Sequence, residues 1–179
     1  GGTQEYLDPV RFIGNPATGK MGSAIAQAAI DRGAIVTLVH GGNTEIPIIP
    51  SPHFRFIPVI SADEMYEAML AHFPTADYTI LSAAVADVKP AHYSTEKLPK
   101  KDIPDCLPLT DVRDIAATLG KQKQSQQTLV GFAAQTGDFV KPAREKMARK
   151  NLDYIVANPI DRTEGGFGSD ENQCIILGK

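Results

Sequence analysis

The chain has only two cysteines among its 179 residues, Cys106 and Cys174, and they lie far apart in the sequence. Two such cysteines exclude a disulfide-rich scaffold and match no zinc-binding spacing, so we expect two reduced thiols. Basic residues are in slight deficit, because the formal net charge is -3 and the pI is about 5.8. A general nucleic-acid-binding protein is usually basic, so this charge balance argues against that class.

Long apolar runs are also missing. No stretch approaches the length that a membrane-spanning helix needs, and no signal peptide is visible. The four histidines share no spacing that would surround a metal ion, and His40, which ends a predicted strand, is expected at the surface. We therefore expect a cytoplasmic protein with no nucleic-acid partner, no membrane partner and no metal site of its own.

Short runs rich in β-branched residues alternate with helical stretches along the chain. The expected helices are 20–32, 62–72, 111–119 and 137–150, and the expected strands are 34–39, 54–59, 78–84, 128–132, 153–157 and 173–177. Ser61 is a plausible N-cap for helix 62–72, with Glu64 at the capping-box position. Strands that alternate with helices predict an α/β, Rossmann-like doubly wound domain, with a mostly parallel sheet and helices on both faces.

Open parallel sheets bind ligands beyond the carboxyl ends of their strands. The segments predicted to lie at that edge are 1–19, 40–53, 83–101, 133–138 and 158–170. Segment 85–106 is long for a connection in a compact domain and carries three prolines, which indicates a functional lid. The chain opens on a glycine pair, so we expect a single domain over 1–179 that lacks its first strand and its C-terminal end.

Two short motifs near the start match nucleotide-binding signatures only in part. Residues 14–21 have the spacing of a phosphate-binding P-loop, but Met21 stands where Mg²⁺ would need a hydroxyl. Residues 18–22 hint at a dinucleotide-binding dehydrogenase, but the next strand ends without the acidic residue that would hold the ribose. Glycines at the start of a helix still expose N–H groups to an anion.

An alternative enzyme class is suggested by Ser82 followed by Tyr93-x-x-x-Lys97, which is similar to the catalytic set of short-chain dehydrogenases. In that family the tyrosine and lysine lie one turn apart on a long helix, whereas Pro90 and Pro99 flank them here. The three residue types nevertheless match, so an NAD(P)-dependent oxidoreductase remains the alternative function.

A series of segments, in this order, carries a more specific resemblance. They are 1–3, 8–13 with Asn15, 18–22, 82–87 with Pro90, 96–101, 131–136, 157–158 and 167–172. Together they resemble bacterial phosphopantothenoylcysteine synthetase, the phosphopantothenate–cysteine ligase half of a bifunctional coenzyme A biosynthesis flavoprotein, over nearly the whole chain. The sequence departs from that family at Ala17 (usually Ser), Pro99 (usually Lys) and Gln135 (usually Glu).

The resemblance implies a CTP-dependent ligase. The carboxylate of 4′-phosphopantothenate attacks the α-phosphate of CTP and pyrophosphate leaves; the amine of L-cysteine then attacks the acyl-cytidylate and releases CMP. The family also implies a homodimer and a flavin-dependent decarboxylase, fused or separate. A nucleotide-binding module that has lost its chemistry is a third class, with Pro99 and Gln135 as its signs.

The resemblance assigns catalytic roles to three residues. Lys97 faces the triphosphate and offsets charge as the cytidylate forms, while Asn15 and Arg11 hold the acyl-cytidylate as cysteine attacks. Each also has a purely structural reading: a solvated loop for Lys97, a turn before Pro16 for Asn15, and a surface ion pair for Arg11. Both readings stay open at this point.

The implied nucleotide site draws on the glycine-rich start, the helix mouth, a strand end and the lysine loop. Its residues are Gly2, Thr18, Gly19, Lys20, Ala84, Asp87, Lys97, Lys100 and Phe132. Phe132 is placed close to the cytosine, and the small side chain of Ala84 lets a base or phosphate approach the backbone. Core packing is the structural alternative for Ala84 and Phe132, and a loop cap for Asp87. Mg²⁺ accompanies the triphosphate on phosphate oxygens and water, and no residue is assigned as a metal ligand.

Overall fold

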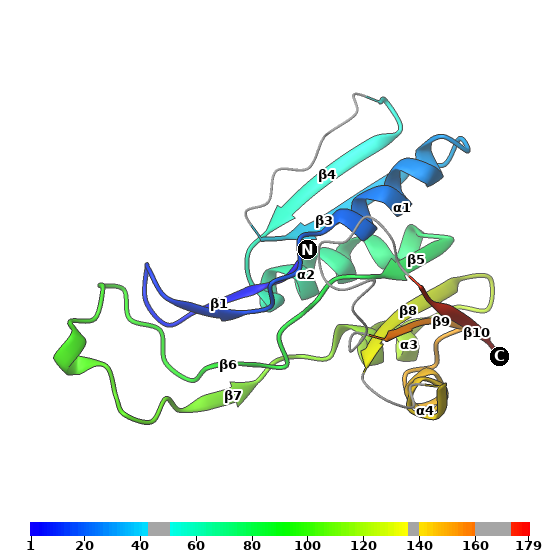
Figure 1. The fold of residues 1–179 in the computed structure, drawn as a ribbon. Helices are drawn as coiled ribbons and strands as arrows, with labels where there is room; N and C mark the ends of the chain where they lie inside the picture. The colour runs from blue at the N-terminus through cyan, green and yellow to red at the C-terminus, as the bar shows by residue number, and fades with distance from the viewer. Residues whose placement is uncertain (43–50, 136–139, 160–172) are drawn as a thin grey trace. The chain divides into compact units, whose positions relative to one another are not determined.

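The computed structural model describes residues 1–42, 51–135, 140–159 and 173–179, and it divides into two compact units. Unit 1 comprises Gly1–Ala68 and Ala83–Arg113, and unit 2 comprises Met69–Ser82 and Asp114–Lys179 (Figure 1). The motif at 167–172, and parts of the predicted edge segments 40–53, 133–138 and 158–170, lie outside the described residues.

Unit 1 combines one parallel strand pair with two short antiparallel ribbons. Its elements are β1 (Gln4–Tyr6), β2 (Phe12–Gly14), α1 (Lys20–Ile30), β3 (Val36–Gly41), β4 (Phe54–Val59), the first part of α2 (Ala62–His72), β6 (Val88–Pro90), the 3₁₀ turn η2 (Lys100–Asp102) and β7 (Leu109–Asp111). β3 and β4 are parallel, whereas β1–β2 and β6–β7 are antiparallel. α1 packs against β3, which places the start of this helix at the carboxyl end of that strand (Figure 1).

Unit 2 is built on a four-stranded sheet with the order β10-β9-β8-β5. Its elements are the end of α2, the 3₁₀ turn η1 (Phe73–Thr75), β5 (Tyr78–Leu81), α3 (Ile115–Gln122), β8 (Thr128–Gln135), α4 (Val140–Arg149), β9 (Tyr154–Pro159) and β10 (Ile175–Gly178). β5, β8 and β9 are parallel and β10 is antiparallel to β9. Leu119, Leu129, Leu152 and Ile155 form the fully buried centre of this unit.

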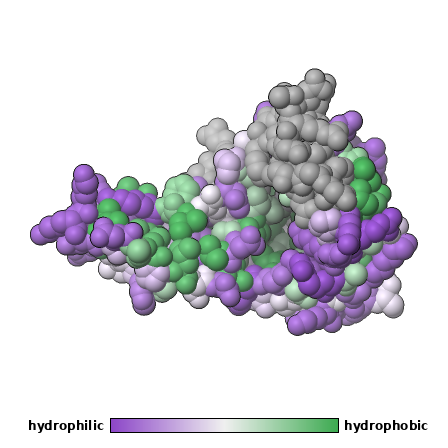
Figure 2. Space-filling view, turned by 60° about the horizontal axis from the view of Figure 1, so that its bottom comes forward, coloured by the Kyte–Doolittle hydropathy of each residue, from purple (hydrophilic) through white to green (hydrophobic). Residues whose placement is uncertain are grey.

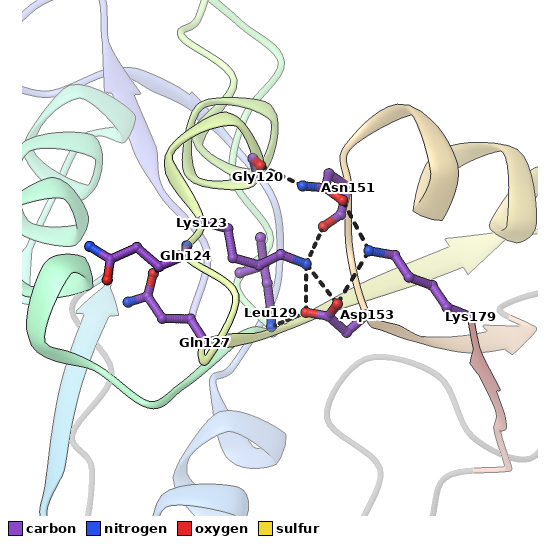
Figure 3. Close-up of polar contacts among 8 residues, drawn as sticks. All are labelled: Gly120, Lys123, Gln124, Gln127, Leu129, Asn151, Asp153 and Lys179. Carbon is purple, nitrogen blue, oxygen red and sulfur yellow. Dashed lines mark hydrogen bonds and ion pairs between the residues drawn. The ribbon is translucent and has the colours of Figure 1, made fainter.

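A partly buried ion pair lies in unit 2 (Figure 3). Lys123 donates from Nζ to both carboxylate oxygens of Asp153, at 2.6 and 2.7 Å, and its side chain is only 8% exposed. Asp153 also accepts from the backbone N–H of Leu129 at 2.8 Å and from Lys179 at 3.2 Å. Burial alone would raise the pKa of Asp153, but Lys123 and the Leu129 N–H outweigh it and lower the pKa. The pair therefore stays charged and ties α3, β8 and β9 together.

The predicted α/β fold with parallel strands is confirmed, and β4 and α2 have the predicted bounds. The capping of α2 differs in one detail: Glu64 accepts from the N–H of Ile60, while Ser61 accepts from the N–H of Glu64. The predicted helix 111–119 is wrong at its start. Asp111 ends β7, and Asp114 caps α3 by accepting from the Ala117 N–H at 2.9 Å.

The described residues contain neither a membrane-spanning helix nor a cluster of metal-binding side chains. None of the helices there is long and apolar enough to cross a membrane. In the same ranges, no three or more histidine, cysteine, aspartate or glutamate side chains gather into an arrangement that could hold a metal ion.

Candidate functional site

The glycine-rich start of the chain runs alongside the segment that follows β5. Gly2 forms a parallel β-bridge with Ala84, with N–H to O distances of 3.2 Å from Thr3 to Ala84 and 3.3 Å from Ala84 to Gly1. The buried hydroxyl of Thr3 accepts from the N–H of Ala86 at 3.0 Å. Two motifs separated by about 80 residues therefore meet within unit 1.

Asn15 joins this meeting point from the end of β2. Its Nδ2 donates to the backbone oxygen of Ala84 at 3.3 Å, and its side chain is exposed. A Cβ added to Gly2 would lie 2.6 Å from the backbone oxygen of Asn15, so only glycine allows this approach. The structure thus brings three predicted site residues together, and the exposed amide of Asn15 can still offer hydrogen bonds to a ligand.

The start of α1 lies against the same segment. Gly19 precedes the helix in the left-handed conformation, with φ of 79°, and a Cβ there would lie 3.2 Å from the Gly1 nitrogen. No side chain caps the helix and its first turn carries no acidic residue. The Lys20 N–H donates to Thr18 Oγ1 at 3.5 Å. The following N–H groups of the first turn and the positive end of the helix dipole can receive an anion. Thr18 and Lys20, both predicted to bind nucleotide, flank this turn, and Lys20 is exposed.

His40 lies in the interior of unit 1, so the predicted surface position is wrong. Its ring is 2% exposed and its Nε2 has no hydrogen-bond partner. A Cβ on Gly19 would lie 2.3 Å from that nitrogen, so the absence of a side chain at Gly19 makes room for the imidazole. Burial lowers the pKa of His40 to about 4. The ring is therefore neutral near pH 7.

Arg11 is committed to contacts within unit 1. Its Nη1 donates to Asp8 Oδ2 and to the backbone oxygen of Leu98, the latter at 3.1 Å. Asp8 is fully buried, and it also accepts from the N–H of Leu98 at 3.2 Å. The ion pair that was weighed as the structural reading of Arg11 is thus present. Asp8 belongs to the motif 8–13, but no role was predicted for it, although an Asp-Pro pair is typical of a turn.

Lys97 and Lys100 are exposed on the long connection between β6 and β7. That connection is attached to unit 1 through the Leu98 contacts and through the Ser94 N–H, which donates to Leu7 at 2.9 Å. Tyr93 and Lys97 do not lie on a helix, so the dehydrogenase-like arrangement is not supported.

The last two predicted residues belong to different units. Asp87 is exposed in unit 1, and its backbone oxygen accepts from the Val112 N–H at 3.0 Å. Phe132 belongs to β8 of unit 2, is partly buried, and accepts at its backbone oxygen from Lys146 at 2.8 Å. The side chain of Gln135 lies outside the described residues.

Comparison with known proteins confirms the resemblance drawn from the motifs. The family model described as the DNA/pantothenate metabolism flavoprotein C-terminal domain matches residues 1–179. The chain is 44% identical over 182 residues to the coenzyme A biosynthesis bifunctional protein CoaBC of Bacillus subtilis (strain 168), covering all of this chain and 43% of that protein. It is 45% identical over 179 residues to a protein of an unknown prokaryotic organism named cysteine/cysteine sulfinic acid decarboxylase, covering 49% of it.

Solved structures agree with the sequence matches. The crystal structure of the C-terminal domain of CoaBC has a TM-score of 0.80 at 37% identity, covering 100% of this chain and 78% of that one. Its domain is Rossmann-like, as predicted for this chain. The chain spans about half the length of the curated relatives it matches. Its motifs, its fold and these matches agree that the chain belongs to the family of DNA/pantothenate metabolism flavoprotein C-terminal domains.

Proposed function

We propose that this chain is a phosphopantothenate–cysteine ligase, which joins 4′-phosphopantothenate to L-cysteine at the expense of CTP. The observation that carries the proposal is the hydrogen-bonded meeting of Gly2, Asn15 and Ala84 beside the uncapped start of α1. It occurs in a chain that is 44% identical to a coenzyme A biosynthesis protein. The arrangement offers amide donors and an anion-binding helix start in one place, which suits a phosphorylated acyl intermediate.

The first step needs charge neutralisation more than covalent help from the protein. The carboxylate of 4′-phosphopantothenate attacks the α-phosphate of CTP, the bond to the β-phosphate breaks, and pyrophosphate leaves. The α1 start, with Thr18, Gly19 and Lys20, receives phosphate oxygens, and Lys97 and Lys100 offset the charge that builds up. Gly2, Ala84 and Asp87, all in unit 1, border the nucleotide.

The second step replaces CMP by cysteine. The amine of L-cysteine attacks the acyl carbon, and the exposed amide of Asn15 donates to the oxyanion that develops there. Arg11 holds the acyl-cytidylate with the guanidinium donors other than Nη1, which is bonded to Asp8 and Leu98. Mg²⁺ supplies further charge neutralisation on the triphosphate. Phosphate oxygens and water would hold the ion, and no side chain of this chain is assigned to it.

A homodimer is part of the same proposal. Unit 1 exposes large apolar side chains on the β1–β2 ribbon, on the β6–β7 connection and on β7. They are Val10 at 56%, Phe12 at 48%, Tyr93 at 58% and Leu109 at 49%. Figure 2 shows hydrophobic residues gathered over this part of unit 1. Exposed apolar patches mark interaction surfaces, and a second copy of the chain is the proposed occupant. A Phe12→Asp variant should then be monomeric by light scattering at a concentration where the parent is dimeric.

The place of the reaction in metabolism follows from its product. Phosphopantothenoylcysteine carries the cysteine carboxylate, which a flavin-dependent decarboxylase removes. That decarboxylase is the proposed functional partner, on the same polypeptide or on a separate one, and both steps take place in the cytoplasm. No membrane or nucleic-acid partner is proposed.

The test is the nucleotide dependence of pyrophosphate release. With 4′-phosphopantothenate present, CTP should support release more strongly than ATP, and adding L-cysteine should yield CMP and phosphopantothenoylcysteine. CTP binding without turnover would instead favour a module that has lost its chemistry. NADPH binding without pyrophosphate release would favour the oxidoreductase alternative.

Two variants separate the steps. Lys97→Gln should slow pyrophosphate release, because it removes charge opposite the triphosphate, whereas the exposed Lys121→Gln on α3 serves as the matched control. Asn15→Asp should slow the cysteine step by about 10²–10³, because a carboxylate cannot donate to an oxyanion. Equal losses in both steps for Asn15→Asp would contradict the assigned role.

A further inference from the structure

Asp8 lies in the turn that joins β1 to β2, and its side chain is fully buried. Its two carboxylate oxygens have different partners. Oδ1 accepts from the backbone N–H groups of Val10 and Arg11, both at 2.8 Å, which closes the turn locally. Oδ2 accepts from Arg11 Nη1 and, at 3.2 Å, from the N–H of Leu98, which is 90 positions further along the chain. One oxygen therefore shapes the turn, and the other reaches the lysine-bearing connection.

The residue that Asp8 reaches is held on both sides. The N–H of Leu98 donates to Asp8, and its C=O accepts from Arg11 Nη1 at 3.1 Å. The Leu98 N–H belongs to the peptide group that begins at the Cα of Lys97. Because a peptide group is planar, fixing this N–H restricts where the backbone of Lys97 can lie.

Asp8 is negatively charged near neutral pH. Burial alone would raise its pKa, but the N–H groups of Val10, Arg11 and Leu98, together with the Arg11 guanidinium, outweigh burial and lower the pKa to about 2. Hydrogen bonds to a charged acceptor are stronger than those between neutral groups. The attachment of the connection therefore does not depend on pH near neutrality.

We propose that Asp8 is a positioning residue for cytidylate formation: together with Arg11 it clasps Leu98 to the β1–β2 turn and so holds Lys97 in place for the triphosphate. The inference rests on the role of Lys97 under the proposed function. It adds a link between the two steps, because Arg11, which holds the acyl-cytidylate, is part of the same clasp. Asp8 need not touch the substrate to affect the first step.

Two substitutions at Asp8 test the clasp. Asp8→Asn replaces one carboxylate oxygen by an NH₂ group. If the remaining oxygen still accepts from Val10 and Arg11 in the turn, the NH₂ faces the Leu98 N–H and Arg11 Nη1, which are also donors, and these two hydrogen bonds are lost. Asp8→Ser keeps one side-chain oxygen, which can accept from the backbone N–H groups of the turn. It lacks the second oxygen, which accepts from the Leu98 N–H. Asp105→Asn is the matched control, because Asp105 is exposed on the same connection. Thermal unfolding should show that all three variants fold.

The first readout is limited proteolysis of the folded protein with trypsin, with the fragments identified by mass. Cleavage after Lys97 should be about tenfold faster in both Asp8 variants than in the parent and in Asp105→Asn, because charge-assisted hydrogen bonds no longer hold Leu98. Cleavage at the parent rate in both Asp8 variants would show that Asp8 does not hold Leu98. This outcome does not depend on whether Lys97 has a role in catalysis.

The second readout is pyrophosphate release, measured for Asp8→Ser and Lys97→Gln singly and together. Each single variant should lose about tenfold or more, and the double variant should be hardly slower than Lys97→Gln alone, because Asp8 acts through Lys97. Losses that multiply would overturn the positioning role. A parent-like rate for Lys97→Gln would overturn the proposed role of Lys97 and the positioning role with it, while the proteolysis result would still report on the clasp.

Discussion

Replacing Gly2 by alanine should slow the cysteine step while leaving the protein folded. Gly2 is buried, and its β-bridge with Ala84 restrains its backbone. An alanine Cβ would lie 2.6 Å from the backbone oxygen of Asn15. Non-bonded atoms rest at roughly 3.5 Å and tolerate little compression, so one residue must move by roughly 0.9 Å.

Asn15 is the residue that should move, because it is exposed and can shift outward. The free energy of unfolding should therefore fall by only about 1 kcal/mol, the low end of the cost of overpacking. The effect on catalysis should be larger. A displacement of about 1 Å can cost about 10²-fold in rate, so we expect the cysteine step to slow by roughly 10–50-fold.

The assay compares two rates in Gly2→Ala: pyrophosphate release from CTP, and formation of phosphopantothenoylcysteine after cysteine is added. The second should fall more than the first. Gly178→Ala is the control, because a Cβ there meets only the edge of the Tyr154 ring at 3.1 Å, and its activity should be unchanged. An unaltered ratio of the two rates in Gly2→Ala would refute the reasoning that Gly2 sets the position of Asn15.

Three further perturbations follow from the described contacts. Gly19→Ala should destabilise the protein by about 1–2 kcal/mol from its left-handed backbone alone, and by more from the collision with His40, and thermal unfolding would measure this. The pKa of His40 is lowered to about 4, so between pH 4 and about 6.5 its unfolded form binds a proton that the folded form does not. The free energy of unfolding should therefore fall as the pH drops through this window, and urea unfolding of His40→Gln should show a weaker fall. Asp153→Ala should lower the free energy of unfolding by about 3 kcal/mol, because Lys123, 8% exposed, loses its carboxylate partner and keeps only the backbone oxygen of Asn151. Lys179→Ala should cost less than about 1 kcal/mol, because Lys179 is 51% exposed. Equal costs for these two variants in denaturant titrations would contradict the importance given to burial.

Where local signals were strong, the sequence predicted structure closely. Helix α2 has the predicted bounds, 62–72, because Ser61 and Glu64 satisfy N–H groups at its start through contacts within a few residues. Strand β4 is likewise as predicted. The ribbons β1–β2 and β6–β7 were missed because each strand has only three residues, too few to display a period, and their pairing depends on the rest of unit 1.

The family and the identity of the motif residues were available from the order of residues along the chain, because those motifs are local. Their meeting was not. The bridge between Gly2 and Ala84, the burial of His40 beneath Gly19, and the bond from Asp8 to Leu98 join positions that lie 21 to 90 residues apart. Such contacts arise when packing and hydrogen bonding offset the chain entropy lost in closing long loops, and no local pattern records which pairs will meet. The sequence determined which groups are available for the chemistry, and only the tertiary structure decided which of them act together.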